Sequence, residues 1–359
     1  MYKFILSTLV LVFFNGFANA QGCIVVRNIS GFGQYNHINN SFDTSLWQLN
    51  ITSRYFKSYH DYRGTVNLHT PEQDEAVVKS FSTDFYLSRL MKNGWSVALS
   101  LPISANARTE SKAHGGAGTT RYTTNTFGLG DLRFTVYKWL LKTTVSQKGN
   151  IQLGLGIKLP TGDYKYQDYF HRNDTTKVLA PVNPSIQLGD GGTGIITELN
   201  TFYFFNRSFN IYGNFYYLIN PRDQNGVSVT GGRTPTTLQV ATGNDITSVP
   251  DVYSIRAGLN YNYSKFSFSA GLRQEGSPVN DLFGGSYGVR RPGYNLSFDP
   301  GIVYMMKKVS LYLYVPIIIA RTIKQNVPDA NATKITGIYT SSPGGSGDYS
   351  VFLGVQFSL

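Results

Sequence analysis

The feature that most constrains the fold is a strict alternation of apolar and polar residues that recurs along the chain. Residues 151–159 read Ile, Gln, Leu, Gly, Leu, Gly, Ile, Lys and Leu, so one face is apolar and the other is polar or bare. The same period of two occurs in 95–103, 209–219 and 349–359. Because successive side chains of a strand point to opposite faces, these segments are predicted to be strands with a different solvent on each face.

Twelve segments of this kind follow one another, each bounded by turn-forming residues. They are 47–57, 77–90, 94–104, 126–140, 150–160, 193–205, 209–220, 252–263, 265–274, 294–305, 309–321 and 348–359. Strands of this length can cross a bilayer at the tilt of a barrel, and closure of a barrel pairs every backbone group. We therefore expect an all-β fold, a transmembrane antiparallel β-barrel of about 12 strands.

The connections between these segments alternate between long and short. The long ones are 58–76, 105–125, 161–192, 221–251, 275–293 and 322–347, and the short ones are 91–93, 141–149, 206–208, 264 and 306–308. This asymmetry is typical of outer-membrane barrels, which have long extracellular loops and short periplasmic turns. Within one short connection, Asn93-Gly94 is a favoured pair for a tight turn.

All three tryptophans fall at the predicted periplasmic strand ends, where an aromatic girdle is expected. Trp47 and Trp95 lie on the apolar face. Trp139 has the other parity, which leaves either an inward tryptophan or an error in the strand boundary.

The first 20 residues are typical of a secretory signal with cleavage after Ala20, because a basic Lys3 precedes a short apolar run and a small-residue end. A membrane anchor is disfavoured because the run is too short. Lipid attachment at Cys23 is the alternative, although Ala20-Gln21-Gly22 is a poor signal for it. The predicted organisation is a signal peptide at 1–20, an N-terminal periplasmic or plug segment at 21–45, and a barrel at 46–359. For 21–45, a short extra strand or a disordered tail is the alternative to a plug.

The chain contains few charged residues and many aromatic ones. Charged residues make up 15% of the chain, against about 25% in soluble domains, and aromatic residues make up 14%. The single cysteine cannot form an intramolecular disulfide. The net charge of +11, or +10 without Lys3, is scattered along the chain, so nucleic-acid binding is not expected.

The sequence shows no catalytic, cofactor-binding or metal-binding pattern, and we expect a protein that is not an enzyme. The five histidines lie outside the predicted strands: His37, His60, His69, His114 and His171. Their spacing to cysteine does not fit a zinc site. The glycine-rich run 189–194 could suggest a phosphate cradle, but it lacks a lysine and precedes a strand, so a turn is the better interpretation.

The polar face of the strands would line the lumen, and it carries the candidate functional residues. By parity these are Arg54, Asp84, Arg133, Lys158, Glu198, Tyr212, Tyr216, Arg256, Arg273 and Asp299, together with the aromatic Phe202 and Phe204. Five cations then face three carboxylates, which predicts a preference for anions in an open channel. The alternative is a salt-bridge network that only braces the wall.

Three motifs resemble a known family. GLGDL at 128–132, GIKLPTGDY at 156–164 and PSIQLGDGGTGI at 184–195 resemble the meta-pathway phenol degradation family of outer-membrane β-barrel proteins, which is similar in style to long-chain fatty acid transporters. The resemblance covers about 95–359. It implies a barrel that passes hydrophobic or aromatic compounds, but it assigns no substrate contact. The ending QFSL departs from the terminal Phe or Trp that usually directs barrel assembly.

These observations favour a pore or transporter in the cell outer membrane for passive uptake of small hydrophobic or aromatic compounds. The expected partners are outer-membrane lipid, the barrel-assembly machinery and the solute, without a cofactor. The alternative is a closed structural or surface-binding barrel that transports nothing.

Overall fold

The computed structural model describes residues 46–116, 118–141, 148–345 and 347–359. The predicted signal peptide and the N-terminal segment 21–45 lie outside these ranges, so both stay predictions. Within the described part of the chain, no helix is long and apolar enough to cross a membrane.

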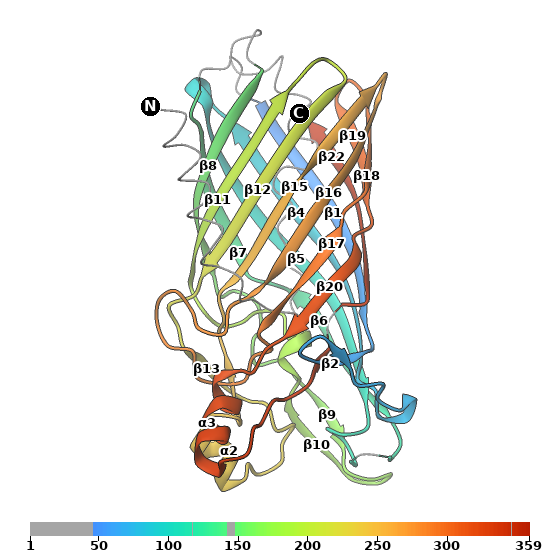
Figure 1. The fold of residues 1–359 in the computed structure, drawn as a ribbon, viewed down its shortest axis with the longest axis vertical. Coiled ribbons are helices and arrows are strands. Elements are labelled where there is room, and N and C mark those ends of the chain that lie inside the picture. Colours follow the sequence, from blue (N-terminus) through green and yellow to red (C-terminus); the bar gives the residue numbers. More distant parts are fainter. Residues whose placement is uncertain (1–45, 117, 142–147, 346) are drawn as a thin grey trace.

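Twelve crossings form one closed antiparallel barrel, and β1 pairs with β22 to close it (Figure 1). Nine crossings are single strands and three are each split in two. The strands are β1 (Leu46–Ser58), β4 (Val77–Leu90), β5 (Trp95–Glu110), β6 (Tyr122–Leu129), β7 (Leu132–Trp139), β8 (Gly149–Leu159), β11 (Gly194–Phe204), β12 (Phe209–Ile219), β15 (Val252–Tyr263), β16 (Phe266–Ser277), β17 (Gly293–Phe298), β18 (Gly301–Met305), β19 (Val309–Tyr314), β20 (Ile317–Ile323) and β22 (Tyr349–Ser358). The predicted fold class is confirmed.

The three split crossings break where the backbone cannot continue the ladder. Pro300 follows β17 and Pro316 follows β19, and a proline has no N–H to donate. The third break, between β6 and β7, contains Gly130 and Asp131, and the Gly130 amide bonds to the Pro102 carbonyl of β5 at 2.8 Å. The sequence predicted these as continuous strands because the alternation resumes beyond each break.

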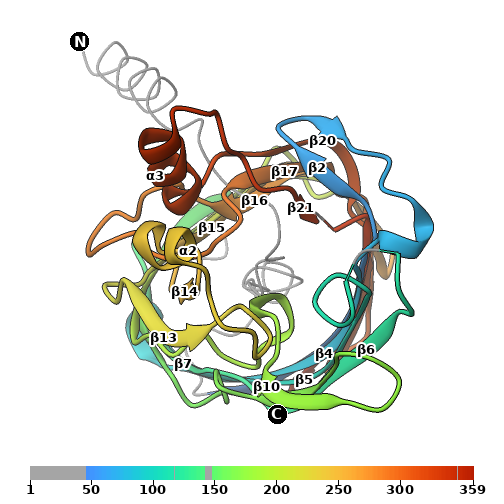
Figure 2. The same cartoon turned by 90° about the horizontal axis from the view of Figure 1, so that it is seen from below.

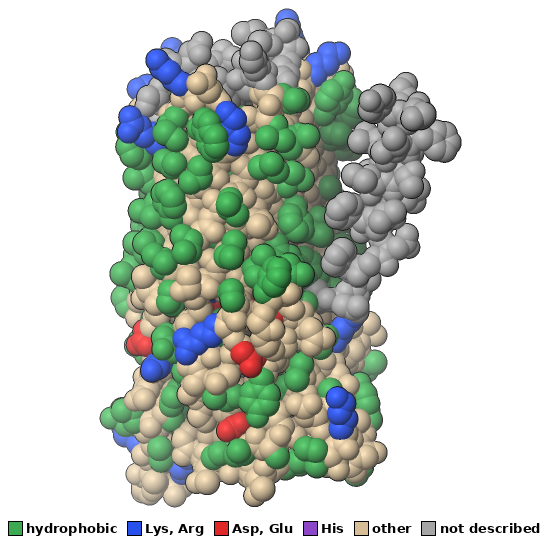
Figure 3. All heavy atoms as spheres, turned by 90° about the vertical axis from the view of Figure 1, so that its left-hand side faces the viewer, with side chains coloured by type: hydrophobic (Ala, Val, Ile, Leu, Met, Phe, Trp, Pro, Cys, Tyr) green, Lys and Arg blue, Asp and Glu red, His purple; other side chains and the backbone are tan. Residues whose placement is uncertain are grey.

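The barrel is apolar outside and polar inside. Figure 3 shows hydrophobic side chains spread over the wall, with lysine and arginine at the short-turn end and again towards the long loops. Exposed outward residues include Phe85, Leu153 and Leu155, whereas buried polar residues outnumber buried hydrophobic ones in the described chain. A water-soluble protein has the reverse arrangement, so the wall fits a lipid environment.

The tryptophans of β1 and β5 mark one boundary of the apolar wall. Trp47 and Trp95 are 42% and 46% exposed, and the cations of Arg89 and Lys138 lie over their rings at 5.4 and 4.8 Å. Such pairs of aromatic rings and cations suit a membrane interface. Trp139 is 5% exposed and packs edge-on against Phe202, so its parity is real and no boundary error is involved.

The turns at the two ends differ as expected. The short turn after β4 has Asn93 and Gly94 at φ values of 60° and 73°. The long loops carry structure that the sequence did not predict, and Figure 2 views it from that end. It comprises β2 (Asp61–Arg63), β3 (Val66–Asn67), β9 (Gln167–His171), β10 (Lys177–Pro181), β13 (Gln224–Ser228), β14 (Ile246–Ser248), β21 (Gly344–Gly345), α2 (Thr237–Thr242), α3 (Val327–Thr336) and the single 3₁₀ turns Glu72–Asp74 and Pro184–Ile186.

Candidate functional site

All ten candidate residues lie on the inner face of the wall. Arg133 is partly buried, and the other nine are buried. Their places are Arg54 on β1, Asp84 on β4, Arg133 on β7, Lys158 on β8, Glu198 on β11, Tyr212 and Tyr216 on β12, Arg256 on β15, Arg273 on β16, and Asp299 in the break between β17 and β18. That they line a conducting path stays a prediction.

One group of charges is centred on Asp299, which is fully buried. A single carboxylate oxygen accepts hydrogen bonds from Arg256 at 2.7 Å and from Arg273 at 3.2 Å. Arg273 also lies 3.7 Å from Glu275. Because each charge has a partner, this group resembles the bracing network that the sequence left as an alternative.

Three inward carboxylates were not counted from the sequence, and one of them is Glu110, which is 7% exposed at the end of β5 and pairs with Arg108 at 2.6 Å. Glu275 is 6% exposed and lies beyond the predicted end of its strand, because β16 continues to Ser277. Asp131 is 7% exposed and lies in the break between β6 and β7; it has the parity of Arg133 in the predicted segment 126–140 but was not counted. With these three carboxylates and with Arg108 of β5, six carboxylates face six cations on the inner wall, so the expected excess of positive charge is absent from the described residues.

A second group of charges brings the three sequence motifs together. The Lys158 ammonium is 3.6 Å from Asp131 and also pairs with Asp190. Asp131 accepts hydrogen bonds from the backbone N–H of Gly162 at 3.1 Å and of Asp190 at 3.4 Å. Residues from GLGDL, GIKLPTGDY and PSIQLGDGGTGI thus meet around one lysine.

Two glycines of these motifs are required because neighbouring atoms lie too close to leave room for a side chain. A Cβ on Gly189 would lie 2.5 Å from the Asp131 carboxylate, and one on Gly162 would lie 2.7 Å from the Leu188 carbonyl. The run 189–194 is a turn that leads into β11, as expected. Its own Asp190 carboxylate accepts the Gly192 N–H at 2.8 Å, which occupies one of the amides that a phosphate would use.

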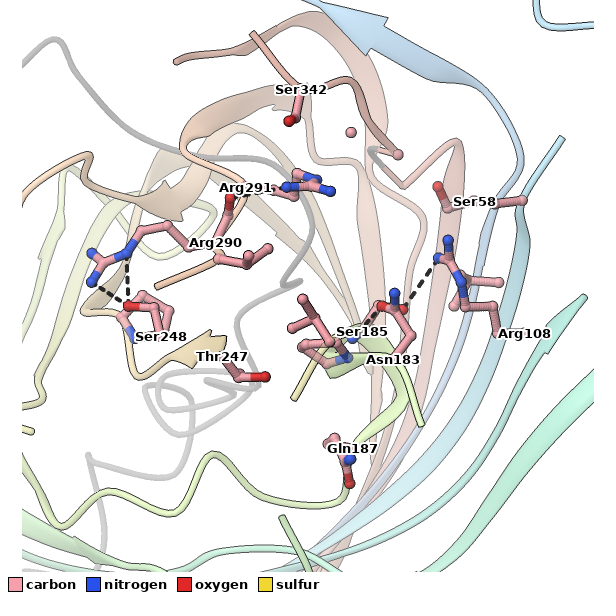
Figure 4. Close-up of a pocket in the computed structure, with 18 of the residues that line it drawn as sticks. Ser58, Arg108, Asn183, Ser185, Gln187, Thr247, Ser248, Arg290, Arg291 and Ser342 are labelled. Atoms are coloured by element: carbon pink, nitrogen blue, oxygen red, sulfur yellow. Dashed lines mark hydrogen bonds between the residues drawn. The ribbon is translucent and has the colours of Figure 1, made fainter. Parts of the chain in front are cut away.

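Residues 182–192 form a segment that folds inside the wall, and we call it the inward segment. The Ile186 carbonyl accepts hydrogen bonds from Asn106 of β5 at 3.2 Å and from Thr126 of β6 at 2.6 Å. The Ile186 side chain is fully buried, and Figure 4 shows Asn183, Ser185 and Gln187 inside the barrel wall. The inward segment therefore narrows the lumen.

The inward segment lies between two cavities. The larger, about 370 Å³, opens among the long loops, and the smaller, about 160 Å³, is lined by Arg54, Arg133, Lys158 and Tyr216. Phe56, Pro184, Ser185, Gln187, Gly189, Asp190 and Pro250 border both cavities. The two cavities therefore adjoin each other across the inward segment.

Inward aromatic rings accompany the charges. The guanidinium of Arg256 lies 5.8 Å from the Tyr212 ring and 5.3 Å from the Tyr314 ring. Tyr312 donates a hydrogen bond from its hydroxyl to Asn50 at 2.7 Å. Tyr312 and Tyr314 were not singled out from the sequence, although their even positions opposite Leu311 and Leu313 carry the same alternation. Among the described residues, no group of three histidine, cysteine, aspartate or glutamate side chains could hold a metal.

The fold is that of a known outer-membrane channel. No family model and no curated protein sequence matches the chain. The solved COG4313 outer membrane channel from Pseudomonas putida F1 is similar, with a TM-score of 0.60, 10% identity, and coverage of 89% of this chain and 98% of that one. The translocator domain of autotransporter NalP from Neisseria meningitidis overlaps less well, with a TM-score of 0.46, 10% identity, and coverage of 91% and 92%.

The first of these likenesses shows that the chain has the barrel fold of an outer-membrane channel. The second overlap is too small to support a conclusion. The more specific resemblance to the phenol degradation family is not confirmed.

Proposed function

We propose that this chain is a passive channel of the outer membrane, with its short turns in the periplasm and its long loops outside the cell. The observation that carries the proposal is a closed wall that is apolar outside and polar inside, with two cavities that adjoin across the inward segment. Its partners are outer-membrane lipid, the barrel-assembly machinery and a small solute. The proposal includes no cofactor and no catalytic step.

The narrower proposal concerns uptake of small hydrophobic or aromatic compounds. The family resemblance and the inward rings of Tyr212, Tyr216 and Phe202 support it. The same inner wall also carries many serine, threonine and asparagine side chains, which favour solutes that form hydrogen bonds. An aromatic ring with polar substituents satisfies both sets of contacts better than a bare hydrocarbon does.

Permeation of liposomes tests the channel proposal. Purified full-length protein in vesicles should let small solutes equilibrate at a rate that falls steeply with solute size, because the lumen is narrowed by the inward segment. Measured against protein-free vesicles, the benzoate anion should pass faster than uncharged trisaccharides. Vesicles that stay impermeable to every solute, while the protein is folded and heat-modifiable on gels, would exclude a channel.

A closed surface-binding barrel is the second candidate, and one observation favours it. Large apolar side chains are exposed at the long-loop end, on or just after α2 and α3: Leu238, Val240, Ile335, Ile338 and Tyr339. An apolar group of this kind is common where proteins meet. Under this candidate, replacing Val240 and Ile338 by serine would abolish surface binding, and neither the parent nor the variant would pass solutes. A channel would instead show flux that does not depend on these residues.

A further inference from the structure

The larger cavity is built from loops that are far apart in the sequence. Residues from β1, β5, the inward segment, α2, β14 and the chain before β22 surround it (Figure 4). Its volume, about 370 Å³, lies within the range of small-molecule sites. Size alone does not say what it binds, but the chemistry of its lining does.

Two buried polar atoms of the lining have no hydrogen-bond partner within the described chain. They are the hydroxyl of Thr247, a residue that is 6% exposed, and the side-chain oxygen of Gln187. The Gln187 nitrogen donates to the Val182 carbonyl at 3.0 Å, which fixes the orientation of the amide. Since buried polar atoms are nearly always hydrogen-bonded, these two are available to a solute in the cavity.

A cation and a carboxylate of the lining, Arg291 and Asp61, have no ion pair within the described chain. The Arg291 guanidinium bonds to the Arg290 carbonyl at 3.3 Å, and no described carboxylate lies within 4.0 Å of it. Asp61 likewise has no ion pair there. Burial raises the pKa of Asp61, and the charges of Arg108 and Arg291 oppose that rise, so these groups share one region.

The other two arginines of the lining are already engaged. Arg108 pairs with Glu110 at 2.6 Å, and Arg290 makes two hydrogen bonds to the buried Asp281. Arg291 is therefore the lining arginine that is available to a solute. The cavity is also lined by apolar side chains that can cover the flat face of a ring: Phe56, Val78, Val229, Val289 and Pro250.

We propose that this cavity binds a small ring compound with neighbouring hydroxyl groups, for which Arg291, Asp61, Thr247 and Gln187 offer polar contacts along the lining. Neighbouring hydroxyls are both donors and acceptors, so they can bridge a guanidinium and a carboxylate that do not touch each other. A dihydroxybenzene and a monosaccharide share this chemistry. The proposal rests on the proposed channel function and names the class of solute that enters it.

Calorimetric titration of the full-length protein in detergent, together with interruption of single-channel current, tests the proposal. The ligands are catechol, glucose and toluene. Catechol carries neighbouring hydroxyls on an aromatic ring, glucose carries them on a saccharide ring, and toluene is a ring without hydroxyls. Catechol or glucose should bind, and toluene should bind at least tenfold more weakly. Tighter binding of catechol than glucose would identify the aromatic source.

Two variants test the assigned contacts. Thr247→Val removes a hydroxyl that has no partner in the protein, so it should leave the melting temperature unchanged and weaken binding about fivefold. Arg291→Gln should weaken binding about tenfold or more. Ser82→Ala removes a buried hydroxyl outside the cavity, and Arg207→Gln removes an exposed arginine at the short-turn end; both should bind like the parent.

Equal binding of toluene, no binding of either hydroxylated ligand, or unchanged affinity in both cavity variants would each overturn this proposal. A protein that conducts and passes solutes but binds neither ligand would leave the channel function standing without this site. A protein that passes nothing but binds catechol or glucose through Thr247 and Arg291 would keep the site and remove the channel function.

Discussion

Lys158 is the residue on which the position of the inward segment depends most. It is 1% exposed on β8, and its ammonium neutralises Asp131 of the wall and Asp190 of the inward segment. A buried cation between two carboxylates cannot be removed without leaving an uncompensated charge. The sequence placed Lys158 in the lumen by parity, but its partner Asp190 comes from a long loop, where no period exists to predict it.

Lys158→Met should loosen the inward segment and raise single-channel conductance, because Asp190 then loses its anchor. We expect a loss of stability of about 3 kcal/mol as well, since two carboxylates are left facing each other. Planar-bilayer recording and thermal melting measure the two effects. Lys79→Met, at an exposed position of β4, is the matched control. Unchanged conductance in Lys158→Met would show that the inward segment is held by its backbone contacts alone.

His114 makes the long loops sensitive to pH. It is 1% exposed, and its Nδ1 accepts the His171 backbone N–H at 3.0 Å, which requires a neutral ring. Burial lowers the pKa of His114 below the ordinary value of 6.5, and His171, Arg172 and Arg233 lower it further, while Glu110 opposes them. As the pH falls, the unfolded loop therefore takes up the proton first.

The loop packing around His114 should be fully stable above about pH 6.5 and lose stability as the pH falls from there through the lowered pKa. Hydrogen exchange of residues 111–116 and 167–171 at pH 7.5 and pH 5 measures this loss. In His114→Gln, which does not titrate, the exchange should no longer depend on pH beyond its intrinsic chemistry. His69→Gln is the control in another long loop. Equal protection at both pH values in the parent would contradict the prediction.

At the scale of elements, the sequence predicts the strands well and the loops poorly. Alternation is unbroken along β1 and β12, so parity alone predicted an inner position for Arg54 and Tyr216, and both are there. It could not show that Pro300 and Pro316 break two crossings, because the period resumes after them. The hairpin β9–β10 was missed for a different reason: its strands of five residues are too short to show a period.

The break between β17 and β18 should matter for stability because it places Asp299 between two arginines. Asp299→Asn removes the charge that Arg256 and Arg273 share, and we expect it to cost about 3 kcal/mol. The temperature at which the folded band disappears on SDS gels measures the change. Asp163→Asn, at an exposed loop position, should leave that temperature unaltered. An equally stable Asp299→Asn protein would mean that the arginines are compensated elsewhere, for example by Glu275.

At the scale of the whole molecule, the inner wall has no excess of charge. In the count made from the sequence alone, five cations faced three carboxylates. That count predicted a preference for anions. The structure adds Glu275 and Asp131 to the inner wall, and both lie close to cations: Glu275 is 3.7 Å from Arg273, and Asp131 is 3.6 Å from Lys158. The predicted strand ended before Glu275, and Asp131 was not counted although it has the parity of Arg133, so the error lay in the count and not in the parity.

We therefore expect only weak ion selectivity, because paired charges of opposite sign produce little net field along the lumen. The reversal potential of the open channel across a tenfold gradient of potassium chloride should lie close to zero. Glu275→Gln, which leaves its cationic neighbour Arg273 without that carboxylate, should shift the preference towards anions, and Arg54→Gln should shift it towards cations. Glu72→Gln, in an exposed long loop, is the control for the first variant. A strong anion preference in the parent protein would show that the carboxylates of the inner wall are not ionised or do not face the conducting path.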